Sequence, residues 1–95
     1  MLDQLTAESF AGRLRDVFVV PTDAGPMELE LAEVEDLGPG GFSRRAFALH
    51  FLGPLRPILP QAIYGLQNEA MGRLDIFLVP LGPRDGRMRY EAIFT

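Results

Sequence analysis

The stretch Leu74-Asp75-Ile76-Phe77-Leu78-Val79-Pro80 is the most apolar run of the chain, and it lies between turn signals at Gly72 and Gly82-Pro83. A short apolar run bounded by turn residues is typical of a β-strand. Side chains alternate along a strand, so the even-numbered aliphatic residues share one face, and Phe77 and Val79 lie on the other. Strands that are apolar on both faces are usually covered on both sides. We therefore expect this stretch to be the central strand of a sheet.

The segments around this stretch predict one small domain, residues 1–95. Thr6 is placed to cap a helix of about residues 6–14, and a β body of about residues 16–95 follows it. Residues 53–60 hold three of the 8 prolines and predict a stiff loop, because proline cannot donate to a β-ladder. Short connections favour antiparallel neighbours. We expect a mainly β fold (α+β by strict count), an antiparallel meander of about six strands, curled or barrel-like, with one short N-terminal helix. The expected strands are 16–20, 27–31, 46–52, 63–67, 74–80 and 88–94.

One of these strands loses its phase. Residues 27–31 alternate between apolar and acidic side chains, and the apolar position then moves by one residue at 32–34. A β-bulge at 32–34 would restore the alternation. Matching the inward faces of this strand and the next predicts the register: Leu31 opposite Leu49, and Glu30 opposite His50 on the outer face.

Composition excludes some classes of protein and disfavours others. The chain has no cysteine, which excludes disulfides and thiolate chemistry. Its net charge is −4, and all 9 basic residues are arginine, a balance that argues against non-specific nucleic-acid binding. Residues 1–8 do not have the pattern of a signal peptide, and no apolar run reaches the roughly 20 residues that cross a bilayer. We expect a cytoplasmic protein that binds neither nucleic acid nor membrane.

Candidate catalytic and metal-binding residues have simpler explanations. His50, the single histidine, could act as a general base, but the sequence identifies no partner for it; an outward strand residue paired with Glu30 is the alternative. The acidic segment could bind Ca²⁺, although a strand spreads its carboxylates apart and a solvated outer face explains them as well. We predict no catalytic residue, no metal site and no cofactor. The acidic segment consists of Glu28, Glu30, Glu33, Glu35 and Asp36.

Arginines offer a second kind of candidate. They could grip a phosphate or a carboxylate, or they could pair with the acidic segment as ordinary surface charge. The glycines form no nucleotide-binding fingerprint, and the chain has no lysine for a phosphate-binding loop. The arginines concerned are Arg84, Arg87, Arg89, Arg44 and Arg45.

The surplus of apolar residues is more informative. Hydrophobic residues make up 47% of the chain, a large share for a small domain with much surface to cover. Several apolar side chains lie opposite the main inward faces and would form an aggregation-prone patch if they were exposed to solvent. Either a second layer covers them or they meet a protein partner or another copy of the chain. The possible interaction face consists of Leu52, Ile63, Phe77, Val79 and Ile93.

Most of the chain can be compared with known sequences through five stretches: residues 2–10, 59–64, 72, 77–80 and 89–94. Together they resemble a family of small uncharacterised bacterial proteins of about 100 residues. The resemblance implies a similar helix leading into a β-rich body. Members of that family are often encoded near phage-tail-collar-like proteins, which implies an association with a tail-like or surface assembly. The family has no established activity, so no catalytic residue is carried over.

Two functions of different classes follow. The first is a non-enzymatic interaction or assembly domain, which the surplus apolar face and the resemblance favour. The alternative is a small β-barrel that binds a small apolar or anionic ligand in a cavity lined by Tyr64, Tyr90 and phenylalanines. An enzyme would need a pocket that holds His50 beside an acid such as Glu30.

Overall fold

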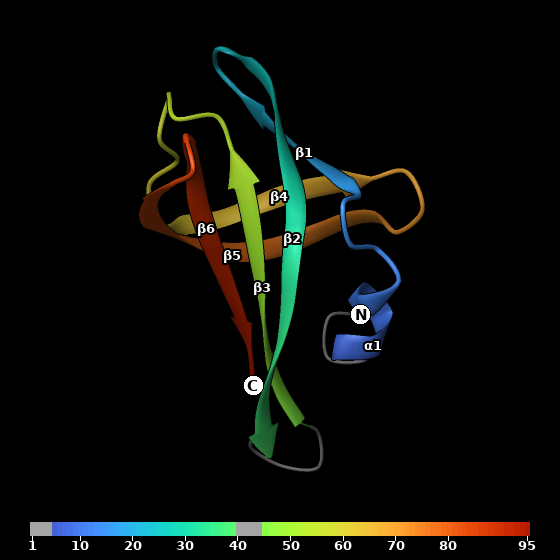
Figure 1. Ribbon diagram of the computed structural model, residues 1–95. Coiled ribbons are helices and arrows are strands. Elements are labelled where there is room, and N and C mark those ends of the chain that lie inside the picture. The colour runs from blue at the N-terminus through green and yellow to red at the C-terminus, as the bar shows by residue number, and fades with distance from the viewer. Residues whose placement is uncertain (1–4, 40–44) are drawn as a thin grey trace.

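The six predicted strands form a closed antiparallel barrel in the computed structural model, which describes residues 5–39 and 45–95 (Figure 1). One short helix precedes the barrel in the chain. This confirms the mainly β fold class. The elements are α1 (Ala7–Ala11), β1 (Val17–Thr22), β2 (Gly25–Pro39), β3 (Arg45–Gly53), β4 (Ala62–Asn68), β5 (Gly72–Arg84) and β6 (Arg87–Phe94).

The barrel is built from two meanders of three strands each. Around the barrel the order is β1-β2-β3-β6-β5-β4, and β4 closes on β1. The first meander is β1-β2-β3 and the second is β4-β5-β6. The proline-rich segment 54–61 joins them, as a non-strand connection of the kind that the sequence predicts.

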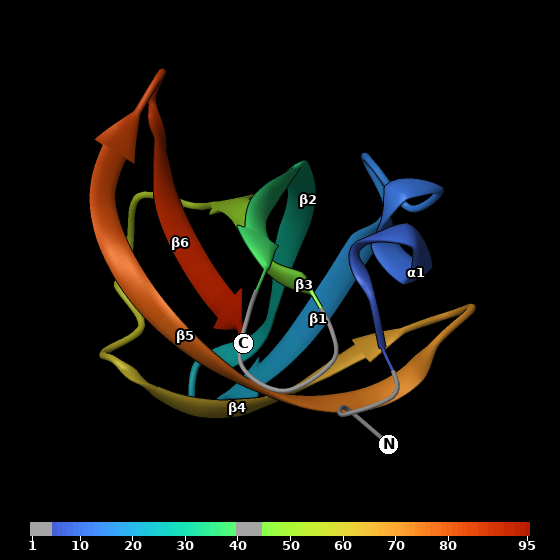
Figure 2. The ribbon, with the colours of Figure 1, turned by 90° about the horizontal axis from the view of Figure 1, so that it is seen from below.

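The middle strand of each meander is long and is shared between its two neighbours. β2 pairs with β1 through residues 25–30 and with β3 through residues 30–39, with a register shift between Leu31 and Glu33. The bulge predicted from the broken alternation is therefore present. β5 pairs with β4 through residues 72–78 and with β6 through residues 79–84. Figure 2 shows how strongly β5 curves as it passes from one neighbour to the other.

The end of β5 differs from the prediction. The Gly82-Pro83 pair was expected to end the strand, but β5 runs on to Arg84. A register shift between Pro80 and Gly82 absorbs the irregularity, and Gly82 takes a φ of 110°, which glycine adopts without strain. The chain reverses only at Asp85 and Gly86, whose φ values of 52° and 80° suit a two-residue hairpin turn.

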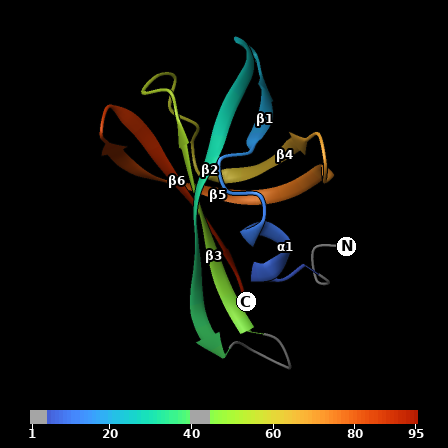
Figure 3. The ribbon, with the colours of Figure 1, turned by 45° about the vertical axis from the view of Figure 1, so that its right-hand side comes forward.

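The inward faces of all six strands make one core. Phe10 of α1 joins it, with its ring centroid 6.0 Å from that of Phe47 and 5.9 Å from that of Phe94. The helix therefore packs its single buried side chain against β3 and β6 near the C-terminal end of the chain (Figure 3). The largest fully buried side chains are Tyr90, Phe10, Phe18, Phe47, Phe51, Leu29, Leu31, Leu49, Leu66, Ile76, Leu78 and Val20.

The helix is shorter than predicted. It ends at Ala11 rather than near residue 14, and Leu14 is exposed. Thr6 is the N-cap residue, and its backbone N–H donates to Ser9 Oγ at 3.0 Å. Gly12, which disfavours a helix interior, stands directly after the last helical residue.

The central-strand prediction is wrong for the outer face of β5. In a closed barrel every strand has two neighbours, and one face of each strand looks away from the core. Ile76 and Leu78 are buried as predicted, whereas Phe77 is 47% exposed. The second apolar face of this strand is thus not covered within the chain.

The predicted register between β2 and β3 is wrong by two residues. Leu31 lies opposite Phe51 rather than Leu49, and Glu30 lies opposite Leu52 rather than His50. A shift of two residues keeps every side chain on its own face, so the alternation in the sequence cannot detect it.

Candidate functional site

Three large apolar side chains lie side by side on the outer face of β4, β5 and β6. Ile63 is the register partner of Phe77, and continuing the β5–β6 register from Val79 opposite Glu91 places Phe77 opposite Ile93. Ile63 is 69% exposed, Phe77 47% and Ile93 56%. All three line one hollow of about 330 Å³. We call Ile63, Phe77 and Ile93 the apolar row.

The five residues predicted as an interaction face do not all lie together. Val79 is half-buried on β5, opposite Glu91 and two residues from Phe77. Leu52 lies elsewhere, between Glu30 of β2 and Arg89 of β6. The structure therefore brings Ile63, Phe77, Val79 and Ile93 into one region and separates Leu52 from them.

The outer face of the first meander carries paired charged side chains. Glu30 accepts a hydrogen bond from Arg87, and Arg15 lies 3.9 Å away on its other side. The hydrogen bond from Arg87 holds the pKa of Glu30 below its ordinary value, against an opposing effect of partial burial. Arg87 therefore pairs with the acidic segment, which is one of the two roles that the sequence allows.

A second pair on this face lies at the far end of β2. Arg45 contacts Asp36 with its Nη2 atom 3.1 Å from Oδ1. The N–H of Gly38 and the Arg45 side chain lower the pKa of the Asp36 carboxyl. Arg45 therefore contacts a different acid from the one that Arg87 contacts. Arg44 lies outside the described residues.

His50 does not meet Glu30. Its Nε2 atom lies 3.1 Å from Glu35 Oε1 and 3.8 Å from Glu91 Oε2. The sequence predicts that His50 pairs with an acid. His50 does so, but its partners are Glu35 and Glu91 instead of Glu30. The cause is the register described above, which moves Glu30 away from His50 and brings the residues beyond the bulge next to it.

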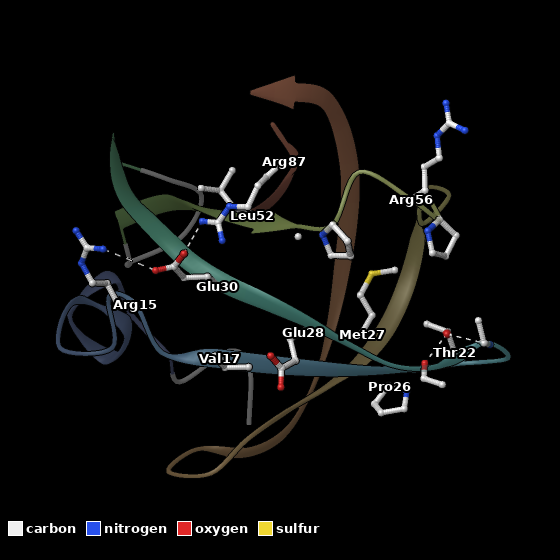
Figure 4. Close-up of a pocket in the computed structure, with 15 residues that line it drawn as sticks. Arg15, Val17, Thr22, Pro26, Met27, Glu28, Glu30, Leu52, Arg56 and Arg87 are labelled. Atoms are coloured by element: carbon white, nitrogen blue, oxygen red, sulfur yellow. Dashed lines mark hydrogen bonds and ion pairs between the residues drawn. The ribbon is translucent and has the colours of Figure 1, made fainter. Parts of the chain in front are cut away.

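A groove of about 700 Å³ opens between the β1–β2 hairpin and the end of β3 (Figure 4). Its walls are apolar at Val17, Met27 and the prolines of the two loops. Glu30 lies at one side of the groove, between Arg15 and Arg87. The groove can take a small ligand with an apolar body, but the Glu30 carboxylate at its side is already engaged by two arginines.

The tyrosines predicted to line an internal cavity have structural contacts. Tyr90 is fully buried in the core, and its hydroxyl accepts a hydrogen bond from the N–H of Leu59 at 2.9 Å. Tyr64 donates to the carbonyl oxygen of Pro60, and burial raises its pKa above the ordinary value of 10.0. Both side chains fasten the proline-rich connection onto the barrel.

Sequence reasoning missed how the groove is assembled. Arg15 follows the helix and Met27 follows the first turn, and neither was singled out as a site residue. The alternation of Glu28 and Glu30 on β2 and of Arg87 and Arg89 on β6 was the one available signal, because it places opposite charges on outward faces.

Within residues 5–39 and 45–95, no group of three or more histidines and acids is arranged to hold a metal ion. Nor does this described part contain a helix long and apolar enough to span a membrane.

Comparison with protein families gives one result. A family model described as a domain of unknown function, DUF6916, matches residues 5–94. The chain belongs to this family. The DUF6916 match covers α1 and all six strands, in agreement with the resemblance to a small uncharacterised family. Neither the curated proteins nor the solved structures that were compared gave a match.

Proposed function

We propose that this DUF6916 domain is a non-enzymatic interaction domain that assembles through the apolar row, in the first place with a second copy of itself. The observation that carries the proposal is the exposure of Ile63, Phe77 and Ile93 together on three adjacent strands. Single exposed apolar residues are ordinary, whereas contiguous apolar patches mark contact surfaces.

The position of the row on strands supports a contact surface. The β4–β5 ladder pairs seven successive residues, from Ala62 opposite Leu78 to Asn68 opposite Gly72, and this ladder holds the backbone under the row. A surface that is ordered before binding loses little conformational entropy on association. An aromatic side chain flanked by two aliphatic ones is also a common composition for the centre of an interface.

The biological setting of the proposal comes from the resemblance. That resemblance implies that proteins of similar sequence are often encoded near phage-tail-collar-like proteins. We propose a role in a bacterial tail-like or surface assembly, whose subunits are made in the cytoplasm. An assembly subunit needs surfaces that bind a partner, and in this proposal the apolar row is that surface.

Light scattering coupled to size exclusion, over a tenfold concentration range, tests the proposal. The wild-type mass should rise with concentration toward a defined oligomer. The Ile93→Glu variant places a charge in the contact and should raise the dissociation constant by at least about thirtyfold, as expected for a residue near the centre of an interface.

The matched control is Ile58→Glu. Ile58 is 52% exposed on the proline-rich connection, close to the 56% of Ile93, but it lies outside the row. This variant should associate like the wild type. A wild-type mass that stays monomeric at every concentration would contradict the proposal, and so would an equal effect of the two substitutions.

A second candidate function is the binding of a small ligand. The groove of about 700 Å³ favours this function. The ligand would bind outside the barrel, because core side chains fill the interior. The methyl group of Met27 reports on this groove. A mixture of small apolar acids and amines should shift its NMR signal if the groove binds ligands of this class, and should leave the buried Met88 signal in place.

A further inference from the structure

Two arginines and the histidine surround a separate small pocket on the outer face. Arg89 comes from β6, His50 from β3, and Arg84 from the last position of β5, just before the Asp85-Gly86 turn. The pocket has a volume of about 220 Å³, and half-buried Leu52 supplies an apolar part of its lining. It shares no lining residue with the hollow that the apolar row lines.

Arg89, one of the lining residues, contains a charged donor without a partner. Its Nε atom is buried and has no hydrogen-bond partner among the described residues. A guanidinium stays protonated in proteins, so this N–H is always a donor. Buried polar atoms are nearly always hydrogen-bonded, and an exception calls for an explanation. Arg84 likewise makes no ion pair with a carboxylate of the described part of the chain.

His50 brings a second unpartnered atom. Its Nε2 faces the carboxylates of Glu35 and Glu91, which can only accept, so Nε2 carries a proton. The Nδ1 atom is buried and has no hydrogen-bond partner within residues 5–39 and 45–95. His50 therefore lies in the pocket lining beside Arg89, where its ring signals report on what the pocket binds.

Two acids of the chain also line the pocket, and they limit what it can take. Glu33 and Asp85 lie on its rim, yet neither makes an ion pair with the described arginines. Their negative charge disfavours a doubly charged anion such as phosphate. A carboxylate carries one charge, and its two oxygens can accept hydrogen bonds from the N–H groups of a guanidinium.

We propose that this pocket binds a carboxylate, with the Arg89 guanidinium as its main ligand and Arg84 as an additional donor. The volume equals that of about seven waters at roughly 30 Å³ each. It therefore admits a carboxyl group with a short alkyl chain, which would lie against Leu52. The carboxylate belongs either to a free small acid or to an acidic side chain of a protein partner.

NMR titration tests the site directly, because the Arg89 Nε–H group gives its own signal. Sodium acetate, N-acetyl-glutamate amide and inorganic phosphate are titrated separately at constant ionic strength. Acetate should shift the Arg89 Nε–H and His50 ring signals saturably. Binding of the glutamate amide at least tenfold tighter than acetate would assign the site to a protein side chain, and equal affinities would assign it to a free acid.

Three variants sharpen the test. Arg89→Gln should weaken acetate binding at least tenfold, and Glu33→Gln should strengthen it because a competing negative charge is removed. Arg56→Gln is the control, since Arg56 is exposed and does not line this pocket. If Arg89→Gln does not fold, Arg84→Gln takes its place with the same direction and a smaller effect.

Several outcomes would overturn the proposal. A shift that never saturates, or that is the same in Arg89→Gln and wild type, would show that solvent alone satisfies the buried donor. Tighter binding of phosphate than of acetate would refute the choice of a carboxylate.

Discussion

β2 and β5 hold corresponding places in the two meanders, but their outer faces are opposite in character. Each is the long middle strand, each contains a register shift, and each gives its inward side chains to the core. Outside, β2 presents several acidic side chains, of which Glu30 is held by two arginines, whereas β5 presents Phe77 between Ile63 and Ile93. The barrel depends on the inner faces alone, so the outer faces are free to differ and can carry the interactions of the domain.

The largest predicted difference separates the two faces of β5 itself. Ile76→Ala removes a fully buried side chain and should lower the free energy of unfolding by about 2–5 kcal/mol. Phe77→Ala removes a larger side chain from the exposed row and should cost less than about 1 kcal/mol in the dissociated protein. Urea unfolding at low protein concentration measures both values. Similar costs for the two variants would mean that a face of β5 has been assigned wrongly.

Two glycines extend the comparison to the other strands. A Cβ atom on Gly53 would lie 2.5 Å from Cδ2 of Leu29, which is fully buried, so Gly53→Ala should destabilise the barrel by about 1–3 kcal/mol through overpacking. A Cβ atom on Gly65 would meet only the exposed side chain of Arg73, at 2.7 Å from Nε. Because that side chain can move away, Gly65→Ala should change stability by no more than about 0.5 kcal/mol. Thermal unfolding of the two variants at matched concentration measures the two losses of stability. Equal losses would contradict the difference expected between the inner and outer faces.

The smallest effect belongs to the charged face of β2. Glu30→Gln should cost about 0.2–1 kcal/mol at pH 7, and Glu28→Gln, on the same face without an ion pair among the described residues, should cost nothing measurable. The pKa of Glu30 is lowered in the folded state from an ordinary value of 4.5, so its contribution is present above that pH and is lost as the pH falls through the folded pKa. The gap between wild type and Glu30→Gln should therefore close in acid. A gap that persists at the lowest pH would contradict the assignment to the Arg87 hydrogen bond.

The sequence predicted the parts of the fold that repeat along a strand. Alternation identified six strands, their inward faces and the bulge after Leu31, because each of these changes the pattern of apolar residues. It could not determine the offset between strands, so Glu30 was paired with His50 although Leu52 lies opposite it. Pro83 was taken for part of a turn, because composition does not reveal that a register shift accommodates the prolines at the end of β5.

The candidate site was predictable to a similar extent. Ile63, Phe77 and Ile93 were found because outward apolar residues on strands are visible in the alternation. Leu52 was grouped with them wrongly, since the pattern shows that a side chain points outward but not which neighbours it meets. The pocket at Arg89 depends on the β3–β6 pairing and on the Asp85-Gly86 turn, and both need the closed barrel to be known.

The most direct test of the central claim uses the four isoleucines as built-in probes. Ile63 and Ile93 lie in the apolar row, Ile58 is exposed outside it, and Ile76 is buried in the core. With selectively labelled isoleucine methyl groups, NMR spectra are recorded over a wide range of protein concentration. We expect the signals of Ile63 and Ile93 to shift as concentration rises, while those of Ile58 and Ile76 stay fixed. Constant signals for Ile63 and Ile93, or an equal shift of Ile58, would contradict the assignment of this face as the contact surface.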